Sequence, residues 1–158
     1  MKIMLSIIML FLTACGGSDS TSPGPSVISH ESVTVIDLQF AYDPATNIPE
    51  PNPFHATVTN DGNVDFYNLY FEFTYISCAA TIADCTGTIL NINRHSGFMS
   101  SLAVGETKDV HLSYNIQYSG LRTARHEVSF SISKETPACF TCSYTPLATK
   151  EISFVTHT

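Results

Sequence analysis

A run of alternating apolar and polar residues at positions 54–75 is the feature that most constrains how this chain can fold. The run opens with FHATVT at positions 54–59 and continues, after a break, with YNLYFEFTY at positions 67–75. A two-residue period is typical of a strand with one buried face. Asn-Asp-Gly-Asn at positions 60–63 suits a tight turn. The run therefore predicts a long hairpin, and its apolar face requires a second sheet packed against it.

Other parts of the chain show the same period, and none shows a convincing helical one. In residues 31–42 the apolar positions change parity between Val35 and Ile36, which predicts a bulge or a strand that changes sheets. Pro44, Pro49, Pro51 and Pro53 predict a loop before the hairpin. Further strands are expected at residues 88–93, 98–102, 109–116, 122–133 and 151–156, and the inward-facing side chains are expected to include Ile36, Leu38, Phe40, Tyr67, Leu69, Phe71, Phe73, Tyr75, Val110, Leu112, Tyr114, Ile116, His126, Val128, Phe130, Ile132, Ile152 and Phe154.

This spacing of strands and turns predicts an all-β fold over residues 31–158, a two-sheet sandwich of about seven antiparallel strands. Apolar residues make up 44% of the chain and charged residues only 13%, a balance that argues against disorder. The formal net charge is −7 and no cluster of Lys or Arg occurs. Nucleic acid is therefore excluded as a partner, because its binding depends on a basic surface.

The first fourteen residues have the features of an export signal. Lys2 precedes an apolar stretch at residues 3–12, which is too short to cross a bilayer as a helix. The stretch ends in Leu-Thr-Ala-Cys at positions 12–15, which resembles the lipobox of bacterial lipoproteins. The alternative is an ordinary signal peptide in which Cys15 occurs by chance.

The lipoprotein resemblance implies that residues 1–14 are a signal peptide and that Cys15 becomes the lipid-bearing first residue of the mature protein. Its acyl chains would hold the protein on a membrane. Gly16, rather than Asp, follows the cysteine, which by the same resemblance favours the outer membrane of the cell envelope over the inner membrane. Residues 15–30 are rich in Gly, Ser and Pro and are expected to form a flexible linker.

The sandwich segment itself resembles a bacterial surface module. Val-Thr-Asn-Asp-Gly-Asn at positions 58–63, Asn-Leu-Tyr-Phe at 68–71 and Leu-Ala-Val-Gly-Glu-Thr at 102–107, followed by Tyr114, are similar to the CARDB-type immunoglobulin-like domains. The resemblance implies an immunoglobulin-like β-sandwich and is hardly specific for function. This chain departs from the family in its four further cysteines and from antibody-type domains in its lack of tryptophan.

Four cysteines follow Cys15, an even number in a chain expected to be exported, where disulfides persist. Cys78 follows the predicted third strand and Cys139 the predicted sixth. If these strands are antiparallel in one sheet, their ends lie at opposite poles, too far apart for a disulfide. The expected pairs are therefore Cys78–Cys85 and Cys139–Cys142. A redox role for the Cys-x-x-Cys at 139–142 and a four-cysteine zinc site are the alternatives.

Asp61, Asn63 and Asp65 alternate in a way that resembles the start of a calcium loop, with Glu72 twelfth. Phe66, however, stands where such a loop needs glycine. A hairpin turn explains the same residues without calcium.

Other motifs for chemistry are lacking. The six histidines show no metal-ligand spacing, and His111 is expected to face outward beside Lys108 and Asp109. His95 and Ser96 are adjacent, so on a strand they face opposite sides and suit a nucleophile–base pair poorly. We therefore expect no enzyme activity and no cofactor.

Phe66, Asn68, Tyr70 and Glu72 share the parity opposite to the core series and form the candidate binding surface. Aromatic and amide side chains on a flat sheet suit a sugar or a protein partner. The alternative is that a loop covers them or that they are merely exposed. The sequence thus predicts a lipid-anchored envelope lipoprotein that acts as a non-catalytic binding or structural module in adhesion or in protein or glycan interaction. An accessory lipoprotein of a larger envelope or secretion assembly is the alternative, and an envelope hydrolase fits less well.

Overall fold

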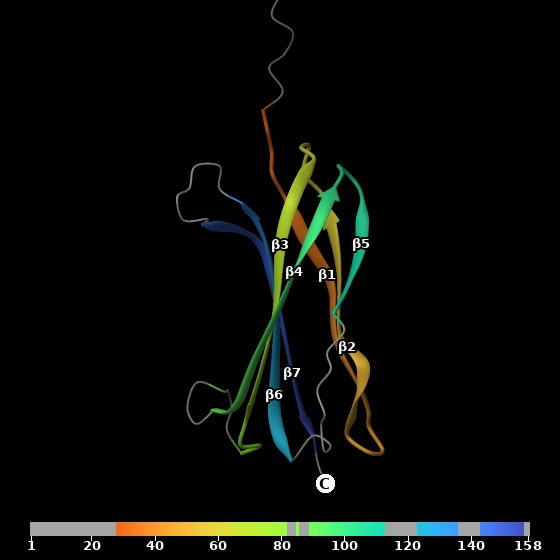
Figure 1. The fold of residues 1–158 in the computed structure, drawn as a ribbon, viewed down its shortest axis with the longest axis vertical. Coiled ribbons are helices and arrows are strands. Elements are labelled where there is room, and N and C mark those ends of the chain that lie inside the picture. The colour runs from red at the N-terminus through yellow and green to blue at the C-terminus, as the bar shows by residue number, and fades with distance from the viewer. Residues whose placement is uncertain (1–27, 82–84, 86–88, 113–122, 136–142, 157–158) are drawn as a thin grey trace, which may run out of the picture.

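The chain folds as a two-sheet β-sandwich in the computed structural model, which describes residues 28–81, 85, 89–112, 123–135 and 143–156 (Figure 1). The described residues contain no helix, and therefore none that could cross a membrane. The seven strands are β1 (Val33–Asp43), β2 (Ile48–Asn60), β3 (Phe66–Cys78), β4 (Ile89–Leu102), β5 (Thr107–Leu112), β6 (Ala124–Glu135) and β7 (Tyr144–Thr156).

One sheet has the strand order β1-β2-β5 and the other the order β4-β3-β6-β7, and every pairing is antiparallel. This is the arrangement of an immunoglobulin-like sandwich in which the fourth strand extends the sheet of the third. The all-β class, the strand number and the two-sheet architecture are confirmed.

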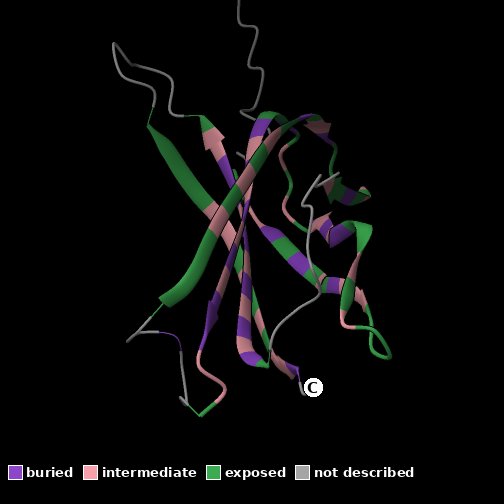
Figure 2. Cartoon of the chain, turned by 60° about the horizontal axis from the view of Figure 1, so that its bottom comes forward, coloured by how far each residue is buried: buried purple, intermediate pink, exposed green. Residues whose placement is uncertain are grey.

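The core consists of the two inner faces, and along the central strands buried residues alternate with more exposed ones (Figure 2). Phe54 of β2 and Phe73 of β3 join the sheets, with ring centroids 5.3 Å apart. Phe73 in turn packs on Phe130 of β6 at 4.7 Å. All three rings are fully buried, and each such burial contributes about 1.5–3 kcal/mol to folding. His126 is also buried, as predicted from its parity, and its ring nitrogens hydrogen-bond the hydroxyls of Tyr75 and Thr156.

The predicted hairpin is wrong, because β2 and β3 lie in different sheets. Its supposed turn is a crossover between the layers, organised by Asn60, which is completely buried. The Asn60 side-chain amide donates to the carbonyls of Val64 at 2.8 Å and Leu102 at 3.0 Å, and its carbonyl accepts from the amide of Gly62 at 3.1 Å. The backbone amide of Asn60 donates to Glu106. These bonds join the end of β2 to the turn between β4 and β5, instead of returning the chain beside β2.

Asn68 changes the parity at the start of β3. Its φ is +53°, a left-handed conformation that asparagine tolerates better than most residues. As a result Phe66 is buried and Tyr67 is 66% exposed, which is the reverse of the prediction for both. From Leu69 onward the predicted inward set is correct.

The predicted bulge in β1 is confirmed, since the register with β2 shifts between Val35 and Asp37. The bulge turns Ile36 outward, where it is 54% exposed, so its predicted place in the core is wrong. The shift keeps Val35 and Leu38 both inward, which a regular strand cannot do.

The prolines at positions 49, 51 and 53 lie within β2, a central strand, so the predicted loop is wrong for residues 48–53. The pairing of β2 with β5, however, begins only at Phe54. The proline segment is thus paired with β1 alone. Proline has no backbone N–H to donate, but in this segment β5 is not paired, so no hydrogen bond to β5 is lost. Two other predicted boundaries also differ, because β4 is one continuous strand and β7 begins at Tyr144 rather than at residue 151.

Cys78 and Cys85 form the predicted disulfide, with their α-carbons 5.5 Å apart. The topological premise also holds, because β3 and β6 are antiparallel neighbours and Cys78 pairs with Arg125 at the start of β6. Cys139 and Cys142 lie outside the described residues, as do Tyr114, Ile116 and the expected signal peptide, and their predictions stand untested.

Replacing Asn60 by Asp should destabilise the protein by about 2–4 kcal/mol, because the carboxylate cannot donate to the carbonyls of Val64 and Leu102. Urea unfolding followed by circular dichroism measures this change. Asn91→Asp is the matched control, since Asn91 is exposed on β4, and its effect should stay within about 0.5 kcal/mol. Equal stability of the two variants would contradict the role assigned to Asn60.

Candidate functional site

The outward side of the four-stranded sheet, here called the outer face, carries aligned rows of aromatic, hydroxyl and charged side chains. Alternate residues of β3 beginning at Tyr70 point to this side, and the strand register sets their neighbours on β4 and β6. The rows across β4, β3 and β6 are Phe98–Tyr70–Ser133, Ser96–Glu72–Ser131, Arg94–Thr74–Ser129 and Ile92–Ile76–Glu127.

Tyr70, Phe98 and Tyr144 form an aromatic cluster at one end of the outer face. The Tyr70 ring stacks on Tyr144 with centroids 4.6 Å apart and meets Phe98 edge-on at 5.5 Å. Phe98 is 70% exposed and Tyr144 is 39% exposed. The cluster therefore presents an apolar platform to solvent, brought together from three different strands.

Glu72 lies next to the aromatic cluster and is held by neighbours on its own strand. The Tyr70 hydroxyl donates to one carboxylate oxygen at 3.3 Å, and the Thr74 hydroxyl donates to the other at 3.4 Å. These are long, weak bonds, so the carboxylate keeps acceptor capacity for an incoming hydroxyl or amide.

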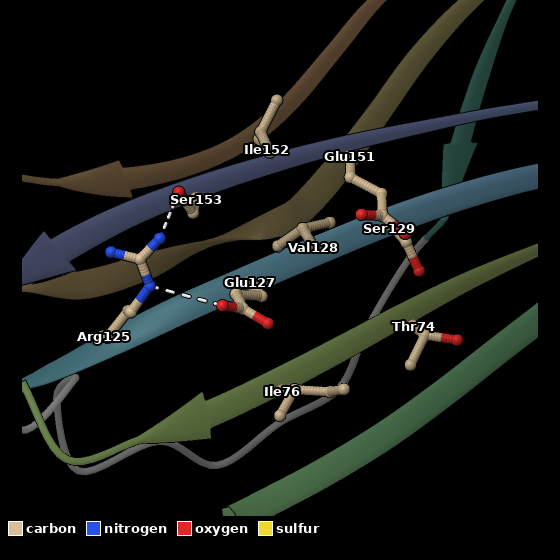
Figure 3. Close-up of a pocket in the computed structure, with 9 residues that line it drawn as sticks. All are labelled: Thr74, Ile76, Arg125, Glu127, Val128, Ser129, Glu151, Ile152 and Ser153. Atoms are coloured by element: carbon tan, nitrogen blue, oxygen red, sulfur yellow. Dashed lines mark hydrogen bonds and ion pairs between the residues drawn. The ribbon is translucent and has the colours of Figure 1, made fainter. Parts of the chain in front are cut away.

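A groove of about 380 Å³ lies further along the outer face and is open to solvent. Figure 3 shows the guanidinium of Arg125 between Ser153 of β7 and Glu127 of β6. Its contacts are 3.0 Å to the Ser153 hydroxyl and 3.3 Å to the Glu127 carboxylate. The volume is within the range of small-molecule sites. The groove is lined by Thr74, Ile76, Arg125, Glu127, Val128, Ser129, Glu151, Ile152 and Ser153.

Glu127 also connects this groove to the disulfide. Its Oε1 accepts from the backbone amide of Cys85 at 2.9 Å, the same oxygen that faces Arg125. The disulfide joins Cys85 to the end of β3, and the Glu127 bond holds Cys85 against β6. One end of the groove is thus braced by a covalent bond and a charge-assisted hydrogen bond.

The structure places two of the four residues of the predicted binding surface on the outer face and one in the core. Tyr70 and Glu72 belong to the outer face, whereas Phe66 is buried in the core because Asn68 shifts the parity. Asn68 itself is exposed at the start of β3. Phe98 and Tyr144 were not predicted for this surface, since only the pairing of the strands brings them beside Tyr70.

The residues considered for calcium do not point to a common centre. Asp61 accepts from the Thr34 hydroxyl at 2.9 Å, Asn63 from the amide of His30 at 2.6 Å, and Asp65 from the amide of Val104 at 2.8 Å. Hydrogen bonds from the hydroxyls of Ser32 and then Thr34 hold the pKa of Asp61 below its usual value. The three side chains thus fasten the crossover after β2 to two segments, residues 30–34 and the turn after β4.

Comparison of the chain with protein-family models, with curated proteins and with solved structures finds no match. The outer face offers an apolar stacking surface, a nearby carboxylate, rows of hydroxyl groups and an open groove, which together suit noncovalent binding of an extended polar ligand.

Replacing Glu127 by Ala should lower stability by about 1–3 kcal/mol, because the Cys85 amide and the Arg125 guanidinium both lose their acceptor. Glu127→Gln keeps an acceptor oxygen and should lose less. Chemical denaturation under non-reducing conditions measures both variants. If both variants were as stable as the unmodified protein, the bracing role of Glu127 would be refuted.

Proposed function

We propose that this protein is a lipid-anchored module of the bacterial cell envelope. Its outer face binds an extended polar ligand, for which a glycan is the first candidate. The aromatic cluster of Tyr70, Phe98 and Tyr144 is the single observation that carries the proposal. The exposed rings of Phe98 and Tyr144 give the cluster an apolar surface, and the tyrosine hydroxyls add polar groups to it. A sugar ring, with apolar C–H faces and an equatorial rim of hydroxyls, complements such a surface.

The polar rows next to the cluster supply the partners that such hydroxyls require. Glu72 and the serines at positions 96 and 131 share one row, and Thr74 and Ser129 share the next. The groove along β6 and β7 extends this polar surface. An extended ligand lying from the cluster toward Arg125 would stack on the aromatic rings at one end and form hydrogen bonds along the rest of its length.

Two independent features support export and anchoring. The Leu-Thr-Ala-Cys sequence at positions 12–15 resembles a lipobox, and the Gly/Ser/Pro-rich residues after it suit a tether. The Cys78–Cys85 disulfide fits an oxidising compartment outside the cytoplasm. Attachment at Cys15 and retention at the outer membrane belong to the proposal, as does membership of the CARDB-type family.

A second candidate function is strand addition by a partner protein along β4, which is an edge strand among those that the structure describes. This strand is fourteen residues long and ends the four-stranded sheet. Ile89, Leu90 and Ile92 in its first part are all exposed. A long edge strand with exposed apolar side chains is suited to pairing with another chain, as expected of an accessory subunit of an envelope assembly.

Replacing Cys15 by Ser should abolish membrane attachment, because serine has no thiol to carry the lipid. Metabolic labelling with a radioactive fatty acid and detergent phase partitioning measure the change. Cys139→Ser is the control and should remain labelled and in the detergent phase. Labelling that persists in the Cys15→Ser protein would rule out this anchor.

Replacing Phe98 by Ala should weaken glycan binding about tenfold or more, since it removes the most exposed ring of the cluster. A glycan array followed by calorimetry on the best ligand measures the change. Tyr67→Ala is the matched control, because Tyr67 is 66% exposed and lies outside the cluster. The melting temperature of both variants should stay unchanged, because neither side chain is buried.

Two outcomes would contradict glycan binding by the outer face. One is an array without any ligand, and the other is binding that Phe98→Ala leaves intact. If envelope proteins co-purify with the chain and Leu90→Lys, but not Phe98→Ala, releases them, the edge of β4 is the binding site instead.

A further inference from the structure

Two histidines lie opposite each other on the outward side of the three-stranded sheet. His55 of β2 pairs in register with His111 of β5, and the next outward pair is Thr57 with Asp109. The two imidazole rings are stacked, with centroids 4.3 Å apart and planes inclined by 4°. Their positions are 56 residues apart in sequence, which is why no metal spacing is visible in the chain itself.

His55, Asp109 and His111, here called the His–Asp cluster, bring three metal-ligand groups close together. One ligand atom of each lies within 4.8 Å of the other two. Nε2 of His55 lies 3.6 Å from Oδ1 of Asp109. Around a tetrahedral Zn²⁺ with bonds of about 2.0–2.1 Å, neighbouring ligand atoms stand roughly 3.3 Å apart. The cluster therefore needs only a modest contraction to reach coordination distance.

The stack itself is not a coordination geometry. The lone pair of an imidazole nitrogen lies in the plane of the ring, so two parallel rings cannot both direct a lone pair at one ion between them. One ring must turn, and the exposed His111, on the short edge strand β5, has room to do so. Ion binding would thus replace the ring stack by a tilted pair.

A second observation on the same residues points to a ligand. Nε2 of His55 is buried and has no hydrogen-bond partner in the described part of the chain. A buried polar atom without a partner is costly, and an ion would satisfy it. This nitrogen is the one that faces the Asp109 carboxylate.

Asp109 is oriented by a neighbouring hydroxyl, as a metal-binding carboxylate usually is. The hydroxyl of Thr57 donates to its Oδ1 at 2.7 Å, which is the type of outer contact that orients metal-binding carboxylates. The adjacent Lys108 turns away, since its ammonium donates to the carbonyl of Ser101 at 2.6 Å and pairs with Glu106.

We propose that His55, Asp109 and His111 form a binding site for a divalent transition-metal ion of the Zn²⁺ type, with Thr57 as the residue that orients Asp109. Two imidazoles and one carboxylate are a donor set that Zn²⁺ accepts, with water completing the coordination. The site lies on the sheet opposite to the proposed glycan surface and does not depend on it.

The direct test is calorimetric titration of ZnCl₂ into the purified protein, prepared without a histidine tag, treated with EDTA and kept under non-reducing conditions. One Zn²⁺ ion should bind per chain. His111→Ala and His55→Ala should each weaken the binding at least tenfold, and Thr57→Val about tenfold. His30→Ala, at an exposed histidine on another part of the surface, is the matched control and should bind as the unmodified protein does.

A second readout separates metal binding from any change in folding. Zn²⁺ should raise the melting temperature of the unmodified protein and of His30→Ala by mass action, but not that of His111→Ala. In ¹⁵N spectra of the imidazoles, the ring nitrogens of His55 and His111 should shift together. No binding up to millimolar Zn²⁺, or binding that both alanine variants at positions 55 and 111 leave intact, would overturn the proposal.

Discussion

The buried hydrogen bonds of Asn60 are the constraint on which the arrangement of this sandwich depends. A polar side chain with no exposed surface must satisfy its donors and acceptor internally, and Asn60 does so with Val64, Leu102 and Gly62. The loop after it is fastened to residues 30–32 by the backbone bonds of Gly62 and Asn63. A side chain on Gly62 would collide with the carbonyl of His30, so this close approach needs glycine.

Because the chain changes sheets at this point, the two sheets present different chemistry to solvent. The four-stranded sheet has an aromatic cluster, hydroxyl rows and a groove, which suit a polar organic ligand. The three-stranded sheet has the His–Asp cluster, which suits a metal ion. Both surfaces are built from cross-strand neighbours, so each requires the register that the shared core imposes. A single hairpin would have placed His55 and Tyr70 in one sheet.

Local periodicity predicts the parts of this fold that follow from local physics. The alternation in β6 correctly places Val128, Phe130 and Ile132 inward, because a strand with one wet face has no other way to bury its apolar side chains. Periodicity cannot show which strands pair, so it predicted a hairpin that the structure lacks and did not predict the aromatic cluster. Nor does it detect a positive φ at Asn68, which moves Phe66 into the core. The proximity of His55 and His111 was not predicted for the same reason, because the pairing of β2 with β5 creates it.

Both proposed surfaces depend on the placement of β2 and β3 in different sheets, and backbone NOEs test this placement most directly. In a ¹³C/¹⁵N-labelled sample, cross-strand contacts between backbone protons should link Phe71 with Ile132 and Ala56 with Val110. Such backbone contacts between residues 54–60 and residues 66–72 should be absent. A ladder of backbone NOEs joining these two segments would show a hairpin, and both proposed surfaces would then have to be given up.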